Sequence, residues 1–159
     1  MRLVMFGMDK SPFAVAIKAA MDEARQRGDR RMGTEHLLLG LLRDPSGPPA
    51  RALGVDARTA RAALEALDQA ALRAIGLDVG DTPLGGPRKH PPIPGTALTS
   101  SARAVINQAV RATSRKSRDH TGPGQVLLEL LEQRHPDPVA ALIDRLGVDR
   151  AAVRARLET

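Results

Sequence analysis

Apolar residues recur along this chain of 159 residues at helical spacing, in stretches separated by glycine and proline. The most apolar stretch is 33–42, where leucines at 37, 38, 41 and 42 make one strongly apolar helical face. We expect Gly33 to end a preceding helix with a positive φ angle, and Thr34 to cap the next helix. Gly40 lies inside that helix and lowers its propensity. Its presence there predicts the close approach of another helix.

The stretch 33–42 recurs in a weaker form at 122–131, 89 residues further along the chain. Each copy is followed by the sequence Leu-Gly-Val-Asp, at 53–56 and at 146–149, and each is preceded by an amphipathic stretch of similar length. An internal duplication explains all three matches together. In the second copy Gly122 and Pro123 disfavour an ordered helix start.

Capping residues indicate where the other helices begin. Ser11 precedes a helix to about residue 27, which Gly28 ends, and Asp56 precedes one to about residue 74. A short helix at 50–53 lies between, and the second half has helices beginning at Thr99 or Ser100, at about 138–146 and at about 149–157. Glycine and proline dominate 76–95, which favours a linker. We predict a first repeat at 1–75, a linker at 76–97 and a degenerate second repeat at 98–159, in one compact domain.

The doubled order of helix, Gly-Thr-Glu-His-Leu-Leu-Leu-Gly-Leu-Leu, short helix, Leu-Gly-Val-Asp and helix resembles the N-terminal domain of the Clp ATPases, the unfoldases that feed the Clp protease. The resemblance covers nearly the whole chain except the linker, and ten consecutive positions fit in the first copy. It implies an all-α fold of about eight helices, as two four-helix repeats about a pseudo-twofold axis. It also implies a domain that binds substrates and adaptors and has no catalysis of its own.

Composition limits the classes of protein to which this chain can belong. The chain has no cysteine, a net charge of +6 and only two aromatic residues, Phe6 and Phe13. A basic nucleic-acid-binding helical protein is therefore the alternative reading, although no aromatic platform for single strands is available and the arginines are dispersed. No apolar run approaches the ~20 residues that span a bilayer, and the opening residues are too short for a secretory signal. We expect a bacterial-type cytoplasmic protein without membrane contact.

One pair of residues is a candidate for catalysis: a hydrolase could use Glu35 and His36. Neighbouring residues on a helix point about 100° apart, so the two cannot easily face one substrate atom. A packed, hydrogen-bonded His36 is the favoured interpretation. No metal-ligand spacing and no phosphate-loop lysine motif is present, so we expect no enzyme, no metal and no cofactor.

Some relatives bind phosphorylated arginine on their clients, and the resemblance implies which residues would take part. There the Glu of each motif and a Thr just before the first helix of the same repeat hold the modified side chain. The first repeat keeps Glu35 but has Lys10 at the Thr position, and the second keeps Thr99 but has Gly124 at the Glu position. Phe6 matches a phenylalanine that packs on the domain surface. Charged peptides should favour the first repeat, two-site phosphoarginine recognition is not expected, and Gly124→Glu should gain binding.

The leading hypothesis is a Clp N-domain-like module without an ATPase core, either a stand-alone protein or a fragment of a longer ATPase. Its partners would be client peptides or adaptor proteins of the Clp system, with modulation of Clp proteolysis as the consequence. Cyclic-peptide antibiotics target this domain in actinobacterial relatives, so a cyclic peptide is a further expected ligand. Nucleic acid is not an expected partner under this hypothesis.

Overall fold

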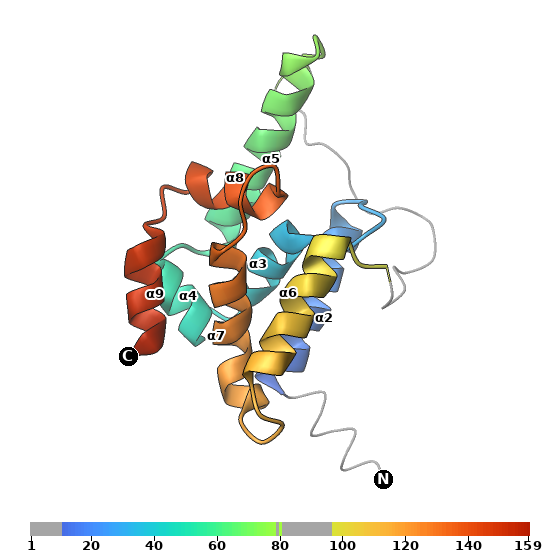
Figure 1. Ribbon diagram of the computed structural model, residues 1–159. Helices are drawn as coiled ribbons and strands as arrows, with labels where there is room; N and C mark the ends of the chain where they lie inside the picture. Colours follow the sequence, from blue (N-terminus) through green and yellow to red (C-terminus); the bar gives the residue numbers. More distant parts are fainter. Residues whose placement is uncertain (1–10, 79, 81–96) are drawn as a thin grey trace.

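Helices make up the described part of the molecule. The computed structural model describes residues 11–78, 80 and 97–159. Within these ranges it has no strand beyond one isolated bridge between Met32 and Leu98, which confirms the all-α prediction (Figure 1). The helices are α2 (Pro12–Gln26), α3 (Thr34–Leu42), α4 (Pro48–Leu53), α5 (Ala57–Ala74), α6 (Ser100–Ala112), α7 (Arg118–Leu131), α8 (Pro138–Arg145) and α9 (Arg150–Glu158).

Side-chain caps begin most of these helices, as the sequence indicated. The side chains of Ser11, Asp56, Thr99 and Asp149 each accept a hydrogen bond from the backbone N–H three residues further on. Asp137 accepts from the N–H of Val139 at the start of α8. Each cap satisfies a donor that a helix start leaves without a partner. The predicted starts of α2, α5, α6, α8 and α9 are confirmed.

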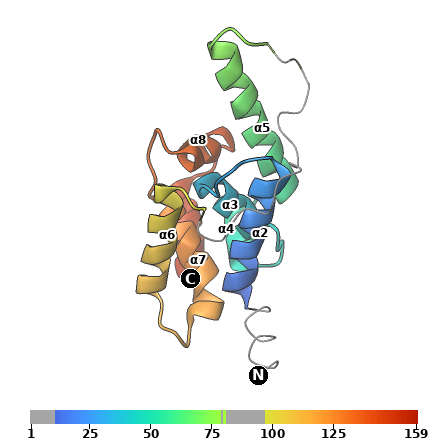
Figure 2. The same cartoon turned by 90° about the vertical axis from the view of Figure 1, so that its right-hand side faces the viewer.

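The centre of the first repeat is the contact between α2 and α3, which follow one another and pack side by side (Figure 2). Gly40 makes this contact possible: a Cβ atom there would lie 2.6 Å from both the Ala16 oxygen and the Ala20 nitrogen. The close approach expected at Gly40 is confirmed. The leucines of α3 are all buried, with Leu38 wholly buried and Leu41 4% exposed.

The chain enters α3 differently from the prediction. Gly28, with φ 77°, is the glycine that ends α2. Gly33 has φ −104° and ψ −177°, which is extended backbone, and it occupies the N-cap position itself. Thr34 is the first helical residue, and its hydroxyl donates to the carboxylate of Asp137 rather than capping α3. The predicted roles of Gly33 and Thr34 were wrong, because α2 already ends at Gly28 and four residues separate Gly28 from the N-cap Gly33.

The second repeat follows the same order, with α6 to α9 in place of α2 to α5. Its helix α7 begins at Arg118, five residues before the position that matches Thr34. The expectation that Gly122 and Pro123 disfavour an ordered helix start was therefore wrong: both lie inside α7 and are buried. Gly122 allows a close contact between repeats, because a Cβ atom there would lie 2.5 Å from Cδ2 of Phe13.

The end of α5 projects from the body of the molecule, at the pole opposite the start of α2 (Figures 1 and 2). Most of the predicted linker, residues 79 and 81–96, lies outside the described residues, and the predicted domain boundaries stay predictions. On the far side of the linker, Ala97 and Thr99 form backbone hydrogen bonds with Met32, of 2.9 and 3.0 Å. None of the helices described is long and apolar enough to cross a membrane.

Candidate functional site

A hollow of about 440 Å³ opens where the α2–α3 loop and the start of α3 meet the middle of α5 and the first residue of α8. Three of the elements that form it belong to the first repeat, and Pro138 belongs to the second. Charged side chains of both signs dominate its wall. Its lining residues are Arg27, Asp29, Arg30, Arg31, Glu35, His36, Leu64, Asp68 and Pro138.

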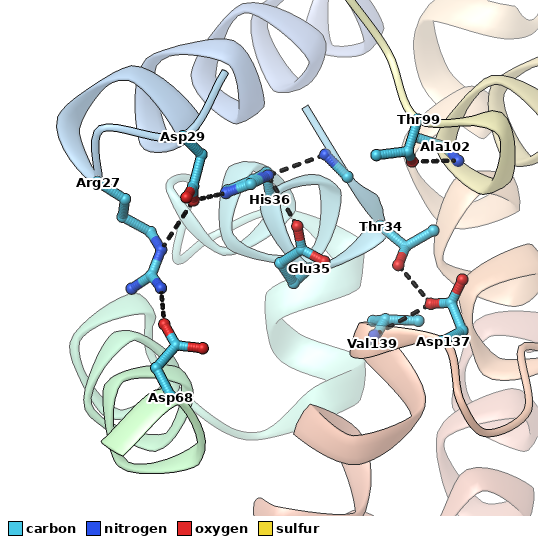
Figure 3. A network of polar contacts seen from close by, with 11 residues as sticks. Arg27, Asp29, Thr34, Glu35, His36, Asp68, Thr99, Ala102, Asp137 and Val139 are labelled. Carbon is cyan, nitrogen blue, oxygen red and sulfur yellow. Dashed lines mark hydrogen bonds and ion pairs between the residues drawn. The ribbon is translucent and has the colours of Figure 1, made fainter. Parts of the chain in front are cut away.

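His36 forms the floor of this hollow, with its side chain only 2% exposed. Its Nε2 lies 2.8 Å from the carboxylate of Asp29, and its Nδ1 lies 3.0 Å from Oε1 of Glu35 (Figure 3). Burial by itself lowers the pKa of His36, but the hydrogen bonds and charges of the two carboxylates outweigh burial and raise that pKa to about 9. A pKa of that size favours the charged form of His36 at neutral pH.

The nitrogen Nδ1 of His36 has two possible partners and can serve one at a time. The backbone N–H of Gly33 lies 2.9 Å from it and can donate only to the neutral ring. In the charged ring the same nitrogen donates to Glu35 instead. Both ring nitrogens are engaged in either form, so His36 offers no free lone pair for proton abstraction. The interpretation of His36 as a packed, hydrogen-bonded residue is confirmed.

Glu35 has an oxygen without a partner. Its side chain is 14% exposed, and its Oε2 is buried and makes no hydrogen bond with the described residues. The carboxylate lies over Gly33, where a Cβ atom would be 2.3 Å from Oε1; this position therefore requires glycine for the observed placement. A buried acceptor that lacks a donor costs free energy. A ligand that brings an N–H donor to Oε2 would remove this free-energy cost.

Arg27 closes one side of the hollow and is fully occupied there. Its guanidinium contacts Asp29 at 3.4 Å and Glu65 at 3.7 Å, and it also pairs closely with Asp68. These contacts fix α5 to the end of α2 (Figure 3). Burial raises the pKa of Asp68 in spite of the neighbouring Arg27. The pairing of Arg27 leaves it unavailable to a ligand.

Arg30 and Arg31 stand on the rim of the hollow and are exposed. No hydrogen bond or ion pair joins either to another described residue. The hollow thus combines an inner acceptor, the Glu35 oxygen, with two cations at its mouth that have no partner within the described part of the chain. The sequence interpretation missed both arginines, although an Arg-Arg pair one residue before the Gly-Thr-Glu-His motif was a visible signal.

The first helix of each repeat begins next to the second helix of the other repeat, and this decides where the predicted binding residue Thr99 lies. Thr99 caps α6 and is joined to Met32, three residues before Glu35, by its backbone. Ser11, which caps α2 as Thr99 caps α6, donates from its hydroxyl to Asp119 at the start of α7, at 2.6 Å. Each repeat therefore begins beside the second helix of the other repeat. Thr99 is not among the residues that line the hollow at Glu35. Phe6 and Lys10 lie outside the described residues, and their predicted roles stay predictions.

Comparisons with known proteins agree with this fold. The family model of the Clp repeat (R) N-terminal domain matches residues 11–137. The negative regulator of genetic competence ClpC/MecB of Bacillus subtilis is 32% identical over 141 residues, which cover 86% of this chain. A probable ATP-dependent Clp protease ATP-binding subunit of Chlamydia pneumoniae is 31% identical over 145 residues, 89% of this chain.

A chloroplastic chaperone protein ClpC1 of rice is 37% identical over 91 residues, 54% of this chain. The matched regions amount to 16%, 15% and 10% of these three relatives in turn. The chain thus spans a small part of the length of the curated relatives it matches. Since the family model covers most of the chain, the protein belongs to the Clp N-terminal repeat domain family.

Proposed function

We propose that this chain is a non-catalytic binding module for charged peptide segments, held at the hollow beside Glu35. The observation that carries the proposal is the buried oxygen Oε2 of Glu35, which has no donor among the described residues. The oxygen belongs to a hollow of about 440 Å³, large enough to admit a side chain. A peptide presents the required donors as guanidinium, ammonium or backbone N–H groups.

The charges around the hollow define the kind of peptide. The acceptor inside favours a basic side chain, and charge-assisted hydrogen bonds to a carboxylate are the stronger kind. Arg30 and Arg31 at the rim favour an acidic group next to that basic side chain. A phosphorylated arginine combines both features in one residue, and a basic residue beside an acidic one spreads them over two. A charged linear peptide suits this wall better than an apolar cyclic peptide does.

The state of His36 supports the proposal of binding without catalysis. A general base needs a free lone pair near the substrate, and both ring nitrogens of His36 have partners, Asp29 at Nε2 and either Gly33 or Glu35 at Nδ1. We infer that the module acts by occupying clients or adaptors. Because its relatives include ATP-binding subunits of the Clp protease, we propose partners in the Clp system and competition with the N-terminal domain of a Clp ATPase as its effect on proteolysis.

Nucleic-acid binding is the second candidate, and the net charge of +6 favours it. Charge alone gives retention on heparin that falls steeply with salt and shows no sequence preference. A duplex or single strand bound with sequence preference at physiological salt would promote this candidate over peptide binding.

The deciding experiment titrates two fluorescent peptides of one sequence, with phosphoarginine and with plain arginine, against the wild type and Glu35→Gln. The substitution keeps the shape and removes the charge of the acceptor. We expect weak, salt-sensitive binding by the wild type with little discrimination between the peptides, and a roughly tenfold loss with Glu35→Gln.

The matched control is Glu158→Gln, which removes one carboxylate from the exposed last residue of α9. It should bind as the wild type does. Equal affinity of Glu35→Gln and the wild type would reject the Glu35 hollow as the binding site.

A further inference from the structure

Exposed large apolar side chains are found at two places in the described part of the chain. Ile75 and Leu77, 73% and 53% exposed, follow the end of α5, and Val15, 44% exposed, lies on α2. Since single exposed apolar residues need no explanation, the relation between the two places is what matters. The end of α5 is a projection, and Val15 lines a hollow.

Backbone hydrogen bonds close the projecting end of α5. The N–H of Leu77 donates to the oxygen of Leu72 at 2.9 Å, and the N–H of Gly76 donates to the oxygen of Arg73 at 3.0 Å. Gly76 has φ 90°, so the helix ends in the paired arrangement that brings the last apolar residue back toward the helix. We call Leu72, Ile75 and Leu77 the α5 tip. The tip is a preformed apolar knob.

The hollow at Val15 has an apolar wall and a volume of about 130 Å³. A volume of this size holds roughly four water molecules. The side chain of an isoleucine has four carbon atoms and is therefore of a size that the hollow can accept. Proline and leucine residues from four segments form much of its wall. We call it the proline hollow; its apolar lining includes Pro12, Val15, Leu41, Pro48, Pro49 and Pro123.

The α5 tip and the proline hollow lie at opposite poles of one molecule. Figures 1 and 2 both place the end of α5 at one pole and the start of α2 at the other. The tip therefore cannot fill the hollow of its own chain. The exposed Arg73 borders the tip and the exposed Asp44 lines the hollow, so these two places carry opposite charges. Arg43 also lines the hollow, but its guanidinium is already paired with Asp22 and Glu23.

We propose that the α5 tip of one copy docks into the proline hollow of a second copy. The contact is head-to-tail, so a pair of copies retains one free hollow at one end and one free tip at the other, and association continues into open chains. An apolar knob in an apolar hollow excludes water from both, and an ion pair between Arg73 and Asp44 borders it. The contact is small compared with stable interfaces, so it is weak. It does not involve Glu35 and stands apart from the proposed peptide site.

The test uses two variants that each block one half of the contact. Ile75→Glu puts a charge on the tip and leaves the hollow intact, whereas Val15→Glu blocks the hollow and leaves the tip intact. We expect the average mass of the wild type, by sedimentation equilibrium up to about 1 mM, to rise past that of a dimer. Each variant alone should remain a monomer, with association weakened at least about tenfold by the buried charge.

Mixing the two variants gives the sharpest outcome. The intact tip of Val15→Glu and the intact hollow of Ile75→Glu can form one contact, so the mixture should reach a dimer and stop there. Ala62→Glu, a matched charge change at an exposed position of α5, should associate like the wild type. A wild type that stays monomeric at every concentration, or Val15→Glu that still dimerises through its tips, would overturn the proposal. Helical content and thermal unfolding of each variant show that it is folded.

Discussion

The starts of α3 and α7 are equivalent in the duplication, yet they differ in what they offer a ligand. At the start of α3, Glu35 and His36 line an open hollow whose far wall is Leu64 of α5. At the equivalent of Glu35, Gly124 has no side chain, and Leu157, which is the counterpart of Leu64, lies 3.7 Å from the place of its Cβ. Duplication produced one scaffold twice, and only the first copy keeps the acceptor.

The comparison separates what the fold requires from what a site requires. Leu38 and Leu127 are equivalent residues and both are wholly buried, because each repeat must bury the same face to pack on the other. Gln125 replaces His36 and bonds to Glu129 within its own helix, at 3.3 Å. Packing is therefore retained in both repeats, while the polar cluster exists in one.

The largest effect is expected from the shared core. Leu38→Ala and Leu127→Ala should each lower the free energy of unfolding by ~2–5 kcal/mol, since both leave a cavity in a buried position. Urea denaturation measures both changes. Leu77→Ala, at an exposed residue, is the control and should change it by less than ~0.5 kcal/mol. A loss below about 1 kcal/mol at Leu127 alone would show that the second repeat contributes little to stability.

A smaller effect should come from His36, which the second repeat lacks. Its folded pKa of about 9 lies above the ordinary 6.5, so its contribution to stability is complete below pH 6.5 and is lost as the pH rises through 9. Denaturation at pH 7 and pH 10 should show about 2–3 kcal/mol of loss in the wild type. His36→Gln, which copies the residue of the second repeat, removes the titrating ring.

The quantity to compare is the loss in the free energy of unfolding between pH 7 and pH 10, in the wild type and in His36→Gln. The comparison is needed because lysines and the amino terminus titrate in the same range. The loss between pH 7 and pH 10 should be larger in the wild type than in His36→Gln by the amount given. Parallel curves for the two proteins would mean that His36 is not held as a cation by Asp29 and Glu35.

Helix positions were predictable because their signals are local. Ser11, Asp56, Thr99 and Asp149 cap helices where the sequence placed them, and a capping side chain acts within three residues. The same local reasoning failed at Pro123, which lies inside α7. There the helix is stabilised by burial against the rest of the domain, a tertiary effect that outweighs the propensity of a single residue.

The site was predictable only in part, because it depends on contacts between distant segments. Glu35 could be chosen from its motif, but the arrangement that places Thr99 beside Met32 needs the packing of one repeat on the other. Pro138 joins the hollow for the same reason. The unpartnered oxygen of Glu35 is a property of the folded site, which no spacing in the sequence expresses.

The smallest effect is expected where the second repeat is given back its missing residue. From the sequence, Gly124→Glu should gain binding, but the structure changes that expectation. Leu157 already lies against position 124, so the new carboxylate would meet an apolar side chain, and Gln125 in place of His36 provides no cation beside it. We now expect peptide affinity within about threefold of the wild type, a difference of less than ~0.7 kcal/mol.

Peptide titration with a count of bound equivalents tests this expectation. Gly124→Glu should bind one equivalent, and adding Glu35→Gln should weaken that one by the same roughly tenfold as in the wild type. Adding Leu157→Ala instead removes the side chain that lies against position 124, and it distinguishes obstruction by Leu157 from the lack of a neighbouring cation. A second equivalent bound by Gly124→Glu alone would mean that one carboxylate is enough to make a site, and that the two repeats differ by this residue and not by the surroundings of α7.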